Sequence, residues 1–479
     1  MEIKVRTSIR PSSSDLWFLA YLPLAVSDGI ATPLIPLLAL AHFQASAFVV
    51  VLIIGASAIS QVPFTILWGN LSDRIAHRKY FLVLSFLASG LSIVLMAFAA
   101  NISTFFWLNV VEGLASAASA PIGTMLLLET RQKRWWPEDI GFFGLISGIG
   151  TTVGLAVGFL WLFVLNLRLP LVQVMTALLI LSGILAILAA LIAWRWIEEP
   201  VRLIDRRSLA DLINGNRGLH ERFRHVRAWV LNIVELTRSK AERIPRKEVL
   251  FLAALGVMSA GFYLFYGPFP VYLIQKAHFS DAAVFIVYLG SATATTLLYY
   301  HSGKAVEAHS PKYVFLESLG GRVLLMLLFV PGPVFLFFGL GSAGLVGYVT
   351  VLNALMGVTW AFISTASTLF LVRLVGRSGR GRALGLYNAI AGLGGLLGTL
   401  LGGFLYVAWG VDATYLLASL TVLVGAALLL PIPFHVFTIG HAFRHRYRLS
   451  RSARATTPRP WPPAGGTAPG AAPPSDAHP

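Results

Sequence analysis

Long apolar runs alternate with short polar breaks along most of this chain. A helix needs about 20 apolar residues to cross a hydrocarbon core about 30 Å thick, and twelve runs reach that length. The runs are continuous, without the apolar–polar alternation of barrel strands, so we predict an all-α polytopic membrane protein. The twelve predicted spans are residues 16–42, 47–69, 80–100, 104–128, 140–165, 169–194, 249–275, 282–302, 313–334, 345–372, 383–408 and 413–432.

A long polar interruption divides these spans into two sets of six. We therefore predict an N-terminal six-helix bundle over residues 16–200 and a C-terminal one over residues 249–434. Residues 201–248 are expected to form a basic cytoplasmic connecting loop with an amphipathic helix on the lipid headgroups. A regulatory or partner-binding module is the alternative for this loop. Residues 1–15 are predicted to be a cytoplasmic segment, and residues 435–479 a basic, then Pro-, Ala- and Gly-rich, disordered cytoplasmic tail.

The two halves repeat each other in sequence. The first repeated motif recurs after 234 positions and the next two after 244. Repeats that run in the same direction imply a pseudo-twofold axis along the membrane normal, with a cavity between the halves. We expect the glycine ladders to allow close helix crossing. The three motifs are Gly69-x3-Asp73 with Gly303-x3-Glu307, Asn109-x3-Gly113 with Asn353-x3-Gly357, and Gly148-x-Gly150-x3-Gly154-x3-Gly158 with Gly392-x-Gly394-x3-Gly398-x3-Gly402.

Composition supports the membrane assignment, because 56% of the residues are hydrophobic and only 12% are charged, against about 25% charged in soluble domains. The net charge of +16 does not indicate nucleic-acid binding. Nearly all Lys and Arg residues lie in the N-terminal segment, in alternate loops and in the tail, which predicts cytoplasmic termini in a cell membrane. We see no cleavable signal peptide. The chain has no cysteine, no Walker A loop and no metal-ligand spacing, so we predict that it is not an enzyme and needs no cofactor or metal. We also expect it to be a monomer.

The break between spans 2 and 3 contains the most specific motif, Gly69-x-Leu71-x-Asp73-Arg74 followed by Arg78 and Lys79. Through this motif the chain resembles the major facilitator superfamily over about residues 15–434. Ala76 replaces the motif's second glycine. The resemblance implies transport by alternating access, a cavity lined by spans 1, 4, 7 and 10, and a charge network that closes the cytoplasmic side. The alternative is that the basic residues only set topology. The motif residues are Gly69, Leu71, Asp73, Arg74, Arg78 and Lys79, with Gly303, Glu307 and Lys312 as counterparts in the second half.

Asp28 in span 1 and Glu112 in span 4 are the outstanding ionisable groups within apolar spans. Such a group costs about 2.5–3.5 kcal/mol on insertion scales and marks a candidate functional site. Counted along their helices, the two acids lie about 20 Å and about 12 Å from the outer ends. We predict that one or both bind a coupling proton or a cationic group of the substrate. The alternative is a neutral acid that is hydrogen-bonded to a neighbouring helix.

Uncharged polar and aromatic residues extend this candidate site. The prolines after Gly267 predict a kink in span 7, next to aromatic side chains suited to a mostly apolar ligand. Asn353 and Trp360 are seven positions apart and share one helix face. Tyrosines at the membrane boundary and amides that tie helices together are the alternatives. The further candidates are Asn109, Gln61, Tyr263, Tyr266, Asn353, Trp360 and Asn388.

Arg322 lies about ten residues into span 9. The resemblance makes span 9 peripheral, so we expect this arginine to pair with a neighbour or to extend along the helix toward the membrane surface. If it faced inwards, it would favour an anionic substrate.

These observations predict a secondary active transporter for a small organic solute. Proton coupling and efflux of amphipathic compounds are the favoured forms, because the expected cavity is aromatic and carries few charges. The resemblance does not assign an antiporter, since span 4 has Asn109 where many proton-coupled relatives have Arg and span 5 lacks the proline of the antiporter motif. The alternatives are a uniporter without proton coupling and a non-transporting membrane sensor or enzyme.

Overall fold

The computed structural model describes residues 18–75, 78–119, 122–123, 126, 136–197, 245–330, 342–375 and 380–432. The predicted N-terminal segment, almost all of the connecting loop and the tail lie outside these residues. The first 433 residues form one compact unit, which contains every helix considered below.

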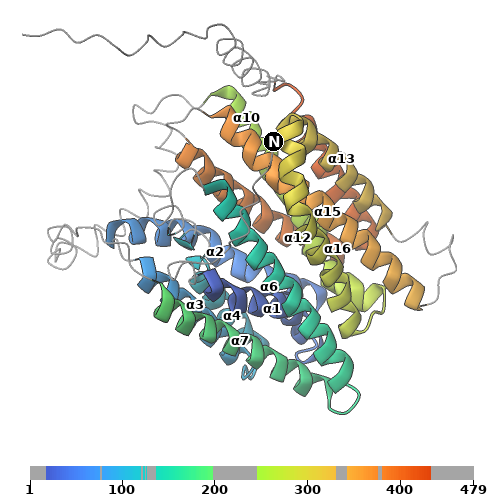
Figure 1. Ribbon diagram of the computed structural model, residues 1–479. Helices are drawn as coiled ribbons and strands as arrows, with labels where there is room; N and C mark the ends of the chain where they lie inside the picture. The colour runs from blue at the N-terminus through green and yellow to red at the C-terminus, as the bar shows by residue number, and fades with distance from the viewer. Residues whose placement is uncertain are drawn as a thin grey trace, which may run out of the picture. The chain divides into compact units, whose positions relative to one another are not determined.

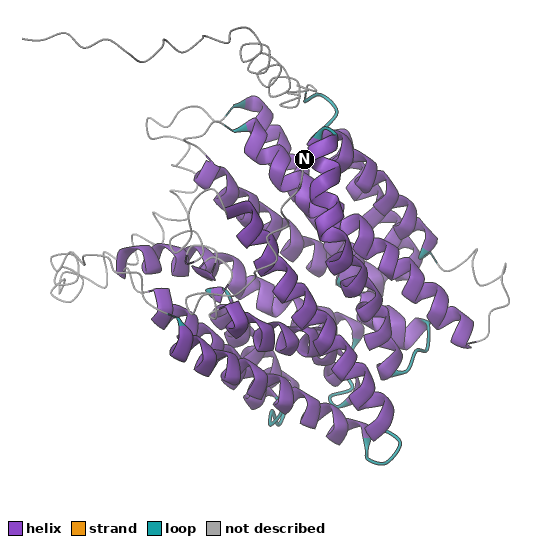
Figure 2. Cartoon of the chain, viewed as in Figure 1, coloured by secondary structure: helices purple, strands orange, loops and turns teal. Residues whose placement is uncertain are grey.

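The described secondary structure is helical (Figure 2). The first half contains α1 (Tyr21–Ala41), α2 (Ala47–Ile75), α3 (Arg78–Met96), α4 (Ile102–Ser116), α6 (Trp136–Leu165) and α7 (Leu171–Trp196). The second half contains α10 (Arg246–Tyr266), α11 (Phe269–Val271), the π-helix Tyr272–Lys276, α12 (Asp281–Ala308), α13 (Pro311–Leu328), α15 (Ser342–Leu374) and α16 (Arg380–Ala427) (Figure 1).

All twelve predicted spans overlap a described helix, although their boundaries shift by several residues. Within the described residues, nine helical segments are long and apolar enough to cross a membrane. The last of these contains parts of two predicted spans, since α16 runs through both. The break predicted between them falls at Gly410, whose φ of 82° is outside the helical region. Glycine is the residue that adopts such a positive φ without steric strain.

The interruption predicted in span 7 is present. Helix α10 ends at Tyr266, and Gly267 and Pro268 separate it from the single turn of α11. Pro268 and Pro270 have no backbone N–H and so cannot continue the hydrogen-bond ladder of a regular helix. The chain then continues as a π-helix, in which Ala277 N–H donates to the Tyr272 carbonyl at 3.0 Å.

Equivalent helix crossings occur in the two halves. A Cβ atom at Gly154 of α6 would collide with the Val26 carbonyl of α1, and one at Gly398 of α16 would collide with the Ala260 carbonyl of α10. Val26 and Ala260 are 234 positions apart, as are the motifs of the two loops. The same close approach is therefore built twice, as expected for two pseudo-symmetric bundles.

Two pairs of helices join the halves to each other. Helix α6 packs against α12, and α2 packs against α16. Two glycines of the first ladder lie at one of these contacts, with Gly148 against Thr296 and Gly158 against Phe285. The remaining central helices, α1 and α10, are mostly buried. This arrangement leaves a cavity between helices of both halves.

Candidate functional site

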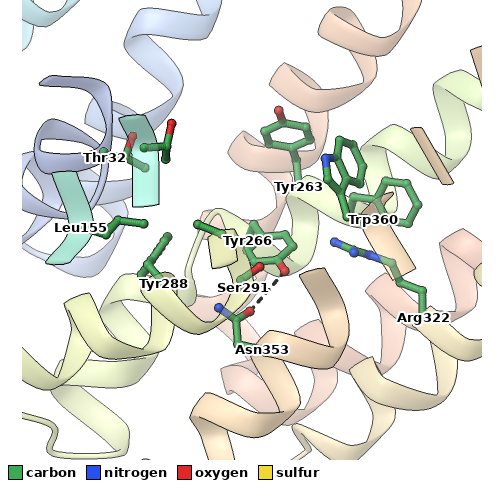
Figure 3. Close-up of a pocket in the computed structure, with 13 residues that line it drawn as sticks. Thr32, Leu155, Tyr263, Tyr266, Tyr288, Ser291, Arg322, Asn353 and Trp360 are labelled. Carbon is green, nitrogen blue, oxygen red and sulfur yellow. Dashed lines mark hydrogen bonds between the residues drawn. The ribbon is translucent and has the colours of Figure 1, made fainter. Parts of the chain in front are cut away.

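A cavity of about 290 Å³ lies among α1, α6, α10, α12, α13 and α15 (Figure 3). Both halves of the chain therefore contribute to it. The first half supplies a small and partly polar wall of Gly29, Thr32, Thr151 and Leu155. The second half supplies five aromatic side chains, Phe262, Tyr263, Tyr266, Tyr288 and Trp360, together with Ser291, Ala292, Arg322 and Asn353.

The aromatic wall comes chiefly from the last turns of α10 and from α15. Phe262 and Trp360 meet edge to face, with ring centroids 6.0 Å apart. Tyr263 and Trp360 are exposed over 46% and 38% of their surfaces, so their rings are open to a ligand. The structure therefore places both predicted tyrosines of span 7 on the cavity.

Arg322 is the one cationic side chain among the described residues that line this cavity. It is 2% exposed, and its guanidinium carbon lies 4.9 Å from the ring centroid of Phe262, 5.4 Å from that of Tyr266 and 5.5 Å from that of Trp360. Nη1 donates to the Met356 carbonyl at 2.7 Å and to Thr359 Oγ1 at 3.3 Å. Nε has no hydrogen-bond partner within the part of the chain that the structure describes.

The expectation that Arg322 extends toward the membrane surface is wrong. Helix α13 packs behind α15 and α16, and the side chain passes between α10 and α15 to reach the cavity (Figure 3). Arg322 is eleven residues from the start of α13, or about 16 Å along the helix axis, and its side chain is buried inside the bundle. It pairs with backbone and hydroxyl oxygens of α15 and with aromatic faces.

The two predicted asparagines make the same bond in opposite halves. Asn109 Nδ2 donates to the Ile53 carbonyl at 2.5 Å, and Asn353 Nδ2 donates to the Val287 carbonyl at 2.8 Å. Only Asn353 lines the cavity, where its Oδ1 accepts a hydrogen bond from the Tyr266 hydroxyl at 3.3 Å. Asn109 is buried and ties α4 to α2.

Asp28 and Glu112 are not among the described residues that line the cavity. Asp28 and Thr32 are the two exposed side chains of α1, one turn apart, and Thr32 lines the cavity. Asp28 therefore lies on the cavity side of its helix. Glu112 Oε1 accepts a hydrogen bond from Ser89 at 3.2 Å, which connects α4 with α3.

Gln61 and Asn388 are not in the lining of this cavity. Gln61 Nε2 donates to Ser116 Oγ at 3.3 Å and so connects α2 with α4. Asn388 is an exposed residue of α16. In the described structure, neither amide contributes to the cavity.

The predicted gate motif is described only in part. Gly69, Leu71, Asp73 and Arg74 lie in α2 and Glu307 in α12, but the side chains of the four non-glycine residues lie outside the description. Arg78 is buried at the start of α3, and Lys79 Nζ lies 5.4 Å from the Trp194 ring centroid. The counterpart Lys312 is buried and donates to the carbonyls of Leu430 and Ile432 at the end of span 12. The described contacts of Lys79 and Lys312 thus stay within their own halves, and closure by this motif stays a prediction.

Several residues that line the cavity were not predicted from the sequence. Some of them lie on spans 5 and 8, two spans that the resemblance had not placed at the cavity. The repeat gave one usable signal: Ser291 lies 234 positions after Ser57, and Gly357 and Gly113 pack on these two serines. Thr32 could have been found one turn after Asp28. The missed residues that line the cavity include Thr32, Thr151, Leu155, Phe262, Tyr288 and Ser291.

Comparison with known proteins decides the family. The family model of the Major Facilitator Superfamily matches residues 17–356. The chain belongs to this superfamily. Its two-bundle helical fold and its place among multi-span membrane transporters, predicted from the sequence, are thereby confirmed. No curated protein matches the chain.

Solved structures of superfamily transporters share this fold. The nucleoside transporter NupG is 14% identical with a TM-score of 0.63, over 88% of this chain and 98% of its own. A bacterial homolog of the human lysosomal transporter Spinster, in an inward-facing conformation, is 13% identical with a TM-score of 0.63, over 87% and 95%. The xylose transporter XylE from E. coli, in an inward-open conformation, is 16% identical with a TM-score of 0.61, over 87% and 95%. Their named substrates differ, so the shared fold does not select a substrate for this chain.

Proposed function

We propose that this chain is a proton-coupled secondary transporter that moves a small organic solute across the cell membrane by alternating access. The observation that supports it most is the cavity built from α1 and α6 of one half and α10, α12, α13 and α15 of the other. Rocking of one half against the other would open such a cavity to one side of the membrane at a time. Its aromatic wall favours amphipathic solutes, with efflux as the proposed direction and both termini in the cytoplasm.

Asp28 and Glu112 are the proposed proton carriers. Asp28 lies in α1 and Glu112 in α4, where it accepts a hydrogen bond from Ser89. A charged carboxylate within a membrane span is costly, so binding a proton lowers the cost of keeping it there. A proton that crosses 100 mV supplies about 2.3 kcal/mol, equivalent to roughly a fiftyfold concentration ratio of solute.

Flux in proteoliposomes with and without a pH step tests this function. At least one of the variants Asp28→Asn and Glu112→Gln is expected to lose the pH-driven component of solute flux. Solute exchange without a gradient should continue in both variants. Asp412→Asn is the matched control, since this exposed carboxylate lies beside Gly410 and is not in the lining of the cavity. Unchanged pH dependence in both test variants would rule out the carriers and favour a uniporter. Absence of any solute movement by the wild type would favour a non-transporting sensor.

A further inference from the structure

We infer that Arg322 binds the anionic group of an amphipathic organic anion, whose apolar body lies against the aromatic wall of the cavity. This inference names the substrate class of the proposed transporter and so rests on the proposed function. It starts from one observation: a buried guanidinium inside the helix bundle lines the cavity and has no carboxylate partner among the described residues.

The bonds that Arg322 makes do not neutralise it. Its partners are the Met356 carbonyl and the hydroxyls of Thr359 and Tyr266, which are all uncharged, and Nε has no partner in the part of the chain that the structure describes. A buried cation without a counter-charge is costly, and cations and anions within membrane segments usually pair. An anion that enters the cavity would supply the missing charge, and guanidinium forks bind carboxylates with two parallel hydrogen bonds.

The aromatic rings around Arg322 determine what the rest of the ligand should be. Phe262, Tyr266 and Trp360 hold the guanidinium between their faces, so the head group of the ligand must approach beside these rings. The aromatic or aliphatic body of the ligand then contacts Tyr263 and Trp360, the two most exposed rings of the wall. The described residues of the opposite wall, which include Gly29 and Leu155, are uncharged, and Asp28 lies on the same side of α1 without being one of them. A small aromatic carboxylate has the chemistry and size for this space.

The competing explanation is that Arg322 only ties α13 to α15 through its two bonds. Three probes with one apolar body separate these explanations: 1-naphthoate, the neutral 1-naphthamide and the cationic 1-naphthylmethylammonium. We expect the purified full-length wild type to bind the carboxylate at least about tenfold tighter than either of the others, measured by calorimetry and by quenching of tryptophan fluorescence. A structural tie would give no preference by charge.

Arg322→Gln is expected to remove the preference for the carboxylate while binding of the amide stays within about twofold. Arg322→Lys, which keeps the charge but loses the planar fork, should retain only part of the preference. Arg373→Gln is the control, because this arginine is exposed at the end of α15, away from the cavity. Thermal unfolding of each variant identifies loss of fold.

The comparison of probes on the wild type needs no mutation, so the inference stays testable even if Arg322→Gln fails to fold. Equal or weaker binding of the carboxylate by the wild type would overturn it, and so would a preference that persists in a folded Arg322→Gln protein. Binding requires no gradient: a carboxylate preference without pH-driven flux would overturn the proposed coupling alone. Flux of the amide or the ammonium probe without a carboxylate preference would overturn this inference alone.

Discussion

Equivalent residues of the two halves have acquired different surroundings. Asn109 and Asn353 make matching bonds to the carbonyls of Ile53 and Val287, but only the second also meets a tyrosine hydroxyl at the cavity. Asn109 therefore connects two helices, whereas Asn353 connects two helices and also lines the cavity. The two acids lie in the first half and the buried arginine in the second, so the two bundles carry different charges.

Asn109→Ala is expected to lower the free energy of unfolding by about 0.6–1.7 kcal/mol, the range for interhelical hydrogen bonds in membrane proteins. Thermal unfolding of the purified protein in detergent measures the loss. Solute binding should be retained, since Asn109 does not line the cavity. Asn388→Ala, at an exposed position of α16, is the matched control and should unfold like the wild type. Equal stability of the two variants would show that the buried bond contributes nothing.

At the scale of helices, hydropathy located the described helices and the break at Gly410, and the prolines after Gly267 predicted the interruption in span 7. The break at Gly410 and the interrupted helix after Tyr266 follow from backbone rules that act locally, so the sequence contains enough information for them. The direction of Arg322 does not follow in this way. Whether a long side chain reaches the membrane surface or an interior cavity depends on how α13 packs behind α15, which no local pattern specifies.

The close crossing of α16 and α10 at Gly398 can be tested by substitution. Gly398→Ala places a methyl group against the Ala260 carbonyl, so α16 must move away from α10. We expect a lower unfolding temperature and reduced solute flux, with a loss of about 1–3 kcal/mol, as is typical of overpacking. Gly347→Ala on α15 is the control, since no atom lies within 4 Å of its added Cβ. If both alanine variants unfolded at the same temperature, the crossing would not need glycine.

The whole molecule combines two six-helix bundles, joined where α6 meets α12 and where α2 meets α16. The chain belongs to the superfamily, and helices of both bundles line its cavity. We therefore propose that this cavity opens to the two sides of the membrane in turn. The sequence predicted four residues of the cavity wall, Tyr263, Tyr266, Asn353 and Trp360. Whether the two acids line the cavity does not follow from the sequence, because helical periodicity gives the direction of a side chain and not its depth in a pocket.

The absence of native cysteine provides the most direct test of that claim. A single cysteine in place of Thr32, an exposed residue of the cavity wall, is labelled with a membrane-impermeant thiol reagent in right-side-out and inverted vesicles. We predict labelling from both sides, with a ratio that shifts when substrate or a pH step is applied. Labelling from one side only, unchanged under every condition in a variant that still transports, would contradict alternating access at this cavity.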